Sequence, residues 1–274
     1  MWRQYKLASK RLANMHRYSR IVVASDAMRL EYVRNGFAPK KVEVVLLPAA
    51  VADSPRTMRA DNRLADALGQ AATAGSTSIA PNQPINLLFV GRMEPLKGGD
   101  VLLEALPRAA ARLSRPITLT LAGDGSLRLE WEARARRVCS HNSAITVNFT
   151  GWLGRPAMTA LFAASDLLVV PSLWPEPFGL IGPEAGMLGL PVAAFAVGGI
   201  AQWLSDGVNG FLAPADPPTA EGLGDAIVKC LCDPERHWRL RCGARREATR
   251  FGLKRHVSKL VGIFTQVATE TNTV

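Results

Sequence analysis

Residues 175–184 read Pro-Glu-Pro-Phe-Gly-Leu-Ile-Gly-Pro-Glu, which places two carboxylates, Glu176 and Glu184, eight residues apart around a turn. The run Leu-Leu-Val-Val at 167–170 predicts a buried strand before this turn. We expect Phe178-Gly179-Leu180 to begin the following helix, with unpaired backbone N–H groups at its start. A strand, a loop and a helix N-terminus in succession are typical of an α/β sheet that binds anionic ligands.

The same pattern repeats on both sides of this stretch. Short apolar runs alternate with stretches of helical period, and this alternation predicts an α/β fold with a Rossmann-like parallel sheet flanked by helices. The predicted strands are residues 85–90, 117–122, 145–149, 167–170 and 191–195. The predicted helices are residues 100–113, 126–138, 156–164, 179–188, 220–231, 234–249 and 251–267.

Gly91-Arg92 and Lys97 follow the predicted strand at 85–90, at the sheet edge where open α/β folds bind ligands. An Arg binds two phosphate oxygens at once and a Lys adds a mobile charge, so the pair suits a diphosphate. Taken alone, each would more often be a solvated surface charge. Glu176 adds an acceptor for sugar hydroxyls and Glu184 one for ribose hydroxyls, so the combination favours a nucleotide-sugar site.

Two glycine motifs have a structural as well as a binding interpretation. Gly123-Asp124-Gly125 follows a strand and is first of all a tight turn, although it could also line the cleft. Gly198-Gly199 either brings backbone close to donor phosphates or joins the strand at 191–195 to the next helix, and the two roles are compatible.

The order and spacing of several motifs carry a family resemblance. These motifs are Val90-Gly91-Arg92, Lys97-Gly98, Ala122-Gly123-Asp124-Gly125, Pro171-Ser172, Glu176-Pro177-Phe178-Gly179 and Glu184. From about residue 85 to 250 the chain resembles the retaining GT-B glycosyltransferases of group 1, or family 4, which include sucrose synthase and bacterial mannosyltransferases. The resemblance implies a GT-B fold and transfer of a sugar from a nucleoside-diphosphate sugar to an acceptor hydroxyl, with retention at the anomeric carbon.

The resemblance also implies roles for the matching residues. Arg92 and Lys97 would hold the diphosphate, Glu176 would orient the donor sugar without attacking it, and Glu184 would bind the ribose. Because the chain has no Asp-x-Asp motif, we expect charge neutralisation by Arg92 and Lys97 with no metal ion and no cofactor. The implied catalytic residues are Glu176, Arg92 and Lys97, and the implied donor-binding residues are Gly91, Arg92, Lys97, Trp152 near the base, Glu176, the backbone of Phe178, Gly179 and Leu180, and Glu184.

The chain departs from the family pattern at two places. Gln202 stands where a Glu often follows the Gly198-Gly199 pair. Gly182-Pro183 replaces the more usual aliphatic residues before Glu184, and a Pro is compatible with a helix there only within the first turn. We therefore expect a small shift in the geometry of the donor site.

Residues 19–48 look like the last strand–helix–strand of the family's amino-terminal domain. We accordingly expect a remnant of that acceptor-side domain at 1–50, a linker at 51–84 with a short helix at 62–70, the donor domain at 85–250, and a crossover helix and tail at 251–274. The rest of the amino-terminal domain, with its His near the reacting sugar, would be missing or separately encoded. His16 is expected to be a surface or packing residue rather than its replacement.

Charge and composition bound the partners. The net charge of +10 is spread along the chain without a nucleic-acid-binding motif, which favours phosphorylated ligands or an anionic membrane over nucleic acid. Residues 1–20 carry a helical apolar stripe beside basic residues, which could lie on a bilayer or pack on the missing domain. No secretory signal precedes it, and the four Cys lack a zinc pattern. We expect a cytoplasmic protein with free thiols and peripheral membrane contact as one alternative.

Three functions stay open at this point. The first is a glycosyltransferase acting on a glycan or lipid-linked glycan, alone or with a separately encoded amino-terminal half. The second is a non-catalytic module that binds a nucleotide sugar. The third is another GT-B enzyme, such as a sugar-nucleotide epimerase or a phosphorylase, because one fold supports several chemistries.

Overall fold

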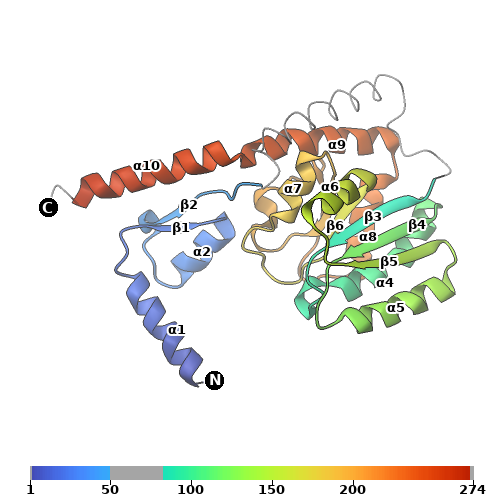
Figure 1. Cartoon of the computed structure of the whole chain (residues 1–274), viewed down its shortest axis with the longest axis horizontal. Helices are drawn as coiled ribbons and strands as arrows, with labels where there is room; N and C mark the ends of the chain where they lie inside the picture. Colours follow the sequence, from blue (N-terminus) through green and yellow to red (C-terminus); the bar gives the residue numbers. More distant parts are fainter. Residues whose placement is uncertain (1, 50–82, 272–274) are drawn as a thin grey trace.

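The computed structural model describes residues 2–49 and 83–271 of the chain. A six-stranded parallel sheet with the strand order β5-β4-β3-β6-β7-β8 forms its larger part (Figure 1). The chain adds β4 and β5 on one side of β3 and then β6, β7 and β8 on the other, so the strand order reverses between β3 and β6. The strands are β3 (Ile85–Val90), β4 (Ile117–Ala122), β5 (Ile145–Gly151), β6 (Leu167–Val170), β7 (Val192–Phe195) and β8 (Gly210–Ala213).

Helices cover both faces of this sheet (Figure 1). One core lies between the sheet and α4, α5 and α8, where Leu102, Trp131 and Ile227 are completely buried. The other lies between the sheet and α6 and α7, and includes Phe162 and Ala185. The helices of this part are α4 (Gly99–Leu113), α5 (Arg128–His141), α6 (Arg155–Ala164), α7 (Ile181–Met187), α8 (Ala220–Leu231) and α9 (Pro234–Ala248), with short 3-10 turns η2 (Pro95–Lys97), η3 (Gly198–Gln202) and η4 (Thr249–Phe251).

Most predicted elements are confirmed, with two corrections. The strands predicted at 85–90, 117–122 and 167–170 have the observed bounds, while β5 runs two residues further and β7 starts one residue later than predicted. Strand β8 was not predicted, because four residues beginning with a Gly carry no readable periodicity. The predicted helix start at 178–180 is wrong: α7 begins at Ile181, because Gly179 has φ +81°, a left-handed conformation outside the helix.

A small amino-terminal unit packs beside the larger part. Its strands β1 (Ile21–Val23) and β2 (Val42–Val44) form a two-stranded parallel sheet, with α2 (Asp26–Arg34) and the turn η1 (Pro39–Lys41) between them. The predicted strand–helix–strand at 19–48 is therefore confirmed. Ahead of it, α1 (Trp2–Met15) extends away from the body (Figure 1), and His16 follows its end and stacks on Phe37 at 4.2 Å between ring centroids.

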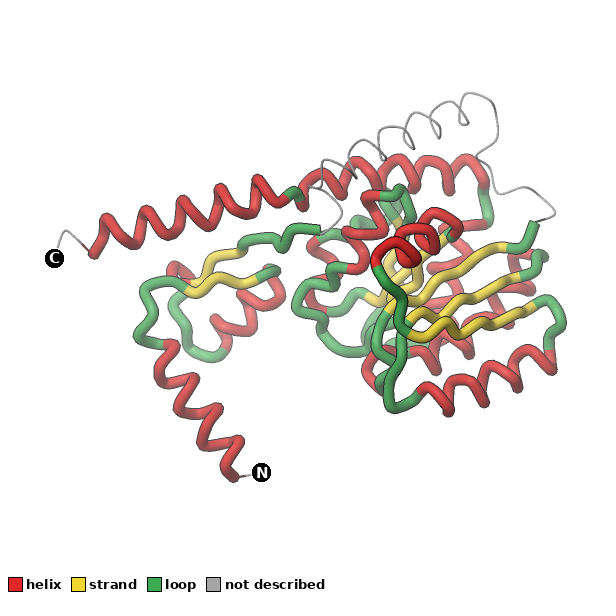
Figure 2. Tube along the Cα trace, viewed as in Figure 1, coloured by secondary structure: helices red, strands yellow, loops and turns green. Residues whose placement is uncertain are grey.

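The last helix, α10 (Leu253–Thr271), runs back along the amino-terminal unit (Figure 2). The Ala49 N–H donates to the Phe251 carbonyl over 2.9 Å, and His256 Nδ1 lies 2.8 Å from the Leu46 carbonyl oxygen. Near its far end, Glu270 Oε1 lies 2.7 Å from Arg20 Nη2. These contacts place α10 against the amino-terminal unit, and the helix starts two residues later and ends four residues later than predicted. The predicted helix at 62–70 lies outside the described residues.

Candidate functional site

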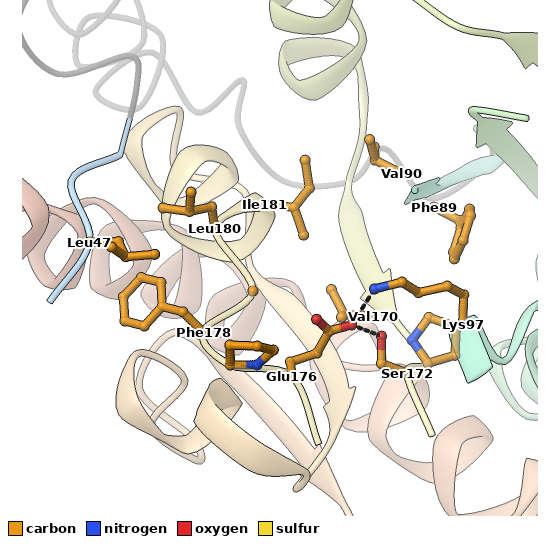
Figure 3. A pocket seen from close by; sticks show the side chains of 13 residues that line it. Leu47, Phe89, Val90, Lys97, Val170, Ser172, Glu176, Phe178, Leu180 and Ile181 are labelled. Carbon is orange, nitrogen blue, oxygen red and sulfur yellow. Dashed lines mark hydrogen bonds and ion pairs between the residues drawn. The ribbon is translucent and has the colours of Figure 1, made fainter. Parts of the chain in front are cut away.

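A cavity of about 310 Å³ opens at the carboxyl ends of β3 and β6, the two strands between which the order reverses (Figure 3). In parallel α/β sheets this position leaves a crevice between loops that turn away in opposite directions, and ligands bind there. The cavity is lined by Leu47, Phe89, Val90, Lys97, Val170, Pro171, Ser172, Glu176, Pro177, Phe178, Gly179, Leu180 and Ile181.

Lys97 and Glu176 meet at the centre of the lining. Lys97 Nζ forms an ion pair with Glu176 Oε1, and the Ser172 hydroxyl donates to the same oxygen over 2.7 Å. The Glu176 side chain is only 12% exposed and that of Lys97 25%, so both charges are largely removed from water. Glu176 lines the cavity, and the carboxylate oxygen that takes no part in the contacts with Lys97 and Ser172 points away from those two side chains (Figure 3). Oε2 has no hydrogen-bond partner among the described residues.

Close backbone packing brings Lys97 to Ser172. Gly98 has φ +66°, and a Cβ at this position would lie 2.0 Å from the Pro171 carbonyl oxygen. The Leu173 N–H also donates to the Leu96 carbonyl over 2.9 Å. Only a Gly permits this approach, so η2 after β3 is held against the loop after β6 and their side chains converge.

The loop that carries Glu176 is held by the Gly198-Gly199 pair. The Gly199 N–H donates to the Glu176 carbonyl over 2.6 Å, and a Cβ on Gly198 would lie 2.5 Å from the Glu176 backbone. Of the two roles expected for this pair, the described contacts are structural: η3 supports the Glu176 loop from below and leads on from β7.

The turn Phe178-Gly179-Leu180 closes one side of the cavity. Phe178 is 1% exposed, and its carbonyl accepts a 2.6 Å hydrogen bond from the Trp203 indole N–H. Gly179, with φ +81°, reverses the backbone, and Leu180 is the N-cap of α7. Phe178 and Gly179 therefore belong to a turn before α7 and only Leu180 to the helix end, while the contacts of these residues with sugar and phosphate stay predictions.

The structure thus brings together Lys97, Glu176, Phe178, Gly179 and Leu180, but not the other predicted residues. Gly91, Arg92, Trp152 and Glu184 lie outside the cavity lining. Arg92 is exposed beyond the end of β3, and Trp152 is 67% exposed after β5. Glu184 is half-buried in the first turn of α7, next to Pro183, whose predicted first-turn position is confirmed. Their donor-binding roles stay predictions.

Eight lining residues were not predicted as site residues, and two of them, Ser172 and Leu47, differ in the signal that the sequence carried. Ser172 lies four residues before Glu176, directly after β6, and this spacing from a strand end was a usable signal. Leu47 comes from the segment after β2 and reaches the cavity only through the tertiary fold, so no local pattern marked it.

The Gly123-Asp124-Gly125 segment leads into a turn that lies slightly later than predicted: Gly123 forms a β-bridge with Gly151, and the turn residues are Ser126 and Leu127. Asp124 accepts hydrogen bonds from the Gly125 N–H over 2.8 Å and from Arg128 over 3.0 Å, and these contacts hold the pKa of Asp124 below its usual value. A Cβ on Gly123 would lie 1.9 Å from the Gly91 carbonyl oxygen. The turn therefore packs the loop after β4 onto the loop after β3.

The described residues also bear on metal binding, membrane insertion and disulfide formation. No group of three or more His, Cys, Asp or Glu side chains that could hold a metal ion occurs within 2–49 and 83–271. Over these ranges, no helix has both the length and the apolar character needed to cross a bilayer. Cys139, Cys230, Cys232 and Cys242 are all free thiols, as predicted.

Comparisons with known proteins agree with this geometry. Residues 84–233 match the family model described as glycosyl transferases group 1. The D-inositol 3-phosphate glycosyltransferase of Thermomonospora curvata is 33% identical over 190 residues, which cover 68% of this chain and 43% of the relative. Glycogen synthase of Mycobacterium tuberculosis is 36% identical over 171 residues, or 61% of this chain and 38% of the relative. The chain spans less than half the length of these curated relatives.

Solved structures share the fold. HepE of Anabaena, in complex with UDP and glucose, superposes with a TM-score of 0.65 at 24% identity, over 93% of this chain and 64% of that one. TarM of S. aureus superposes with a TM-score of 0.71 at 17% identity, over 94% of this chain and 46% of that one. At these identities the likeness concerns the fold, a parallel α/β sheet of GT-B type.

Proposed function

Because this chain belongs to the group 1 glycosyltransferase family, we propose that it binds a nucleoside-diphosphate sugar in the cavity between β3 and β6 and serves sugar transfer to an acceptor hydroxyl with retention. The arrangement of Glu176 carries the proposal. Its Oε1 is engaged by Lys97 and Ser172, and its Oε2 is directed to the cavity without a partner among the described residues. A carboxylate held in this way accepts hydrogen bonds from sugar hydroxyls.

The donor diphosphate would lie on the Lys97 side of the cavity. Lys97 supplies a positive charge inside the lining, and the exposed Arg92 adds a second from the end of β3. The attraction between these two cations and the diphosphate grows as negative charge develops on the departing group. This extra stabilisation of the transition state would lower the barrier to transfer. The proposal needs neither a metal ion nor a cofactor for this step. Glu184 would bind the ribose, and Trp152 would border the base.

The solved relatives suggest the first donor to test. HepE was crystallised with UDP and glucose, and the pneumococcal O-GlcNAc transferase GtfA with UDP and GlcNAc. Uridine nucleotides are therefore the first probes, with guanosine and adenosine nucleotides beside them. The acceptor, a glycan or lipid-linked glycan by family resemblance, would approach from the amino-terminal side, where closure of a second domain excludes water and aligns the reactants.

Location is part of the proposal. We infer a cytoplasmic protein, with α1 in contact either with a membrane surface or with the rest of the amino-terminal domain. Exposed Trp2 and Leu12 together with the basic side chains of α1 support an interfacial position. Sedimentation with anionic vesicles, compared between the full chain and a deletion of residues 1–18, tests it; equal binding by both would contradict membrane contact by α1.

The donor site is tested by thermal shift with UDP, GDP and ADP and their glucose conjugates. A ligand that binds only the folded chain raises its melting temperature. We expect a selective shift with one nucleotide, larger for its sugar conjugate. Glu176→Gln replaces the outward acceptor by an N–H donor at constant volume, and should remove the extra shift of the conjugate. Glu130→Gln, at an exposed position of α5, is the matched control and should behave as wild type.

The results separate the candidate functions. No shift with any nucleotide would contradict a donor site in this chain. Binding without sugar transfer, in the presence of candidate acceptors and an amino-terminal half, would favour the non-catalytic module. Formation of an epimerised nucleotide sugar or of a sugar 1-phosphate would favour another GT-B enzyme. For the transferase, Arg92→Ala should abolish transfer by the reconstituted pair.

A further inference from the structure

The amino-terminal unit touches the loop that carries Glu176. The contact is made by Ser25, the residue between β1 and α2, which is completely buried. Its hydroxyl donates to the Pro177 carbonyl over 2.6 Å, a contact between residues that are 152 positions apart. Beside it, the Asp26 N–H donates to Gln202 Oε1 at the end of η3 over 2.9 Å.

The Ser25 hydroxyl serves two elements at once. It is the N-cap of α2, because it accepts a hydrogen bond from the Met28 N–H over 3.3 Å. The same oxygen gives its proton to Pro177. A hydroxyl has one proton to donate and two lone pairs, so both contacts form together without competition. The start of α2 and the Glu176 loop therefore share one anchor.

The Glu176 loop depends on its carbonyl oxygens for support. Pro175 and Pro177 have no N–H to donate, so this part of the backbone is held mainly through the acceptors that it offers. Two consecutive carbonyls are used: that of Glu176 accepts from Gly199 over 2.6 Å, and that of Pro177 from Ser25 over 2.6 Å. Of these two supports, η3 provides one and the amino-terminal unit the other.

We propose that Ser25 is a positioning residue for the donor-sugar contact: by holding the Pro177 carbonyl, it keeps the adjacent Glu176 carboxylate directed into the cavity. This inference rests on the proposed function, because it gives the donor-sugar subsite a residue from the amino-terminal unit. It implies that binding of the donor sugar depends on the placement of that unit, whereas binding of the diphosphate on the Lys97 side of the cavity does not. A shift of α2 would move the sugar contact before it moved the diphosphate contact.

The test measures affinities for UDP, GDP and ADP and for their glucose conjugates by calorimetry. Ser25→Ala removes the proton donor to Pro177. Since a neutral hydrogen bond contributes a net of about 1 kcal/mol, we expect the conjugate to bind roughly fivefold more weakly. Affinity for the unconjugated diphosphate should stay unchanged. Ser25→Thr keeps the hydroxyl and should restore the affinity for the conjugate to the wild-type value.

The control separates positioning from loss of a helix cap. Thr219→Ala removes the N-cap of α8, where the Thr219 side chain accepts from the Gly222 N–H, and Thr219 is not part of the cavity lining. It should lower stability while the ratio of conjugate to diphosphate affinity stays at the wild-type value. Equal weakening of both ligands by Ser25→Ala, or an unchanged ratio, would overturn the inference.

A measurement without ligand keeps the two proposals distinct. Hydrogen exchange at the amides of Glu176, Phe178, Gly179 and Leu180 should be faster in Ser25→Ala than in wild type and in Thr219→Ala. Gln202→Met, which removes the acceptor for Asp26, should act in the same direction. If the wild-type chain binds no nucleotide, the proposed function fails while this exchange still reports on the Ser25 contact. Unchanged exchange would refute the positioning role itself.

Discussion

Glu176 carries its two carboxylate oxygens in different surroundings. Oε1 is paired with Lys97 and accepts from Ser172, while Oε2 is directed to the cavity. A buried charge is tolerated when it is paired and hydrogen-bonded, and here one oxygen satisfies that requirement for the whole group. The other oxygen is thereby left for a ligand, which explains how a charged acceptor persists in a largely buried lining.

The Lys97–Glu176 ion pair can be tested by comparing the removal of one charge with the removal of both. Lys97→Met leaves the Glu176 carboxylate 12% exposed and without its cation, so we expect the free energy of unfolding to fall by about 1–3 kcal/mol. The double variant Lys97→Met/Glu176→Gln removes both charges and should recover most of that loss. Urea denaturation of the two variants and wild type measures the effect, and equal stability of the single and double variants would contradict it.

The buried side chain of His237 should make the stability of the folded chain depend on pH. It is 1% exposed, and its Nε2 lies 2.8 Å from the Asp166 carbonyl, an acceptor, so Nε2 carries the proton. Nδ1 is buried without a partner among the described residues. Burial lowers the pKa of His237 below its usual 6.5. The hydrogen bond to the Asp166 carbonyl raises the pKa in part, and the nearby charge of Arg241 lowers it further.

Proton linkage gives the direction in which stability changes with pH. Below pH 6.5 the unfolded chain binds a proton at His237 that the folded chain does not, so stability is lost as the pH falls from 6.5 towards the folded pKa. The loss is at most about 1.4 kcal/mol per pH unit. His237→Gln keeps an N–H donor for Asp166 and removes the titration. Its urea midpoint should therefore fall less than that of wild type between about pH 7.5 and about pH 5.5. Parallel falls would contradict the assignment.

At the scale of elements, the short helix α7 depends on glycine packing. It has seven residues, contains Pro183 in its first turn, and lies against the indole of Trp203. A Cβ on Gly182 would come within 2.1 Å of that ring. The replacement of aliphatic residues by Gly182-Pro183 is thus matched by a large buried Trp, which occupies the space of the absent side chain.

Two glycine substitutions should have opposite effects. Gly182→Ala places a methyl group inside the van der Waals radius of Trp203, and we expect a loss of about 1–3 kcal/mol in the free energy of unfolding. Gly262→Ala in α10 has no atom within 4 Å of the new Cβ, and should stabilise by up to about 1 kcal/mol through helix propensity. Chemical denaturation measures both, and a Gly182→Ala variant as stable as wild type or more stable would contradict the Trp203 contact.

At the scale of the whole molecule, the amino-terminal unit is attached at separate places. The cavity loop binds it through Ser25, η4 binds it through Ala49, and α10 binds it through Leu46 and Arg20. Arg20 pairs with Glu43 of β2 over 3.2 Å and with Glu270 of α10 over 2.7 Å. The unit is therefore held between the loop that carries Glu176 and the last helix.

The Arg20 pairs should secure the far end of α10 without governing global stability. The Glu270 side chain is 48% exposed, and pairs of this exposure contribute about 0–1 kcal/mol. In Arg20→Gln we expect faster amide hydrogen exchange in the last turns of α10, with a melting temperature close to wild type. High salt should produce the same effect in wild type. A large fall in melting temperature would contradict this account.

Part of the site could be predicted from the sequence. Glu176, Lys97 and the turn 178–180 were recognised because each follows a strand readable from its apolar run, and strand ends gather at one sheet edge. Arg92, Gly91, Trp152 and Glu184 were predicted with the same logic, yet they lie outside the lining. Sequence spacing places a residue near an edge but does not direct its side chain.

The sequence by itself determined the α/β class, five of the six sheet strands and the Lys97 and Glu176 motifs of the cavity, because periodicity and glycine spacing are local properties of the chain. Only the tertiary structure decided the Lys97–Glu176 pair, the start of α7 and the contact of Ser25 with Pro177. These depend on residues far apart in sequence meeting through close backbone packing. Such meetings are set by the balance of contacts over the whole molecule, which no local pattern records.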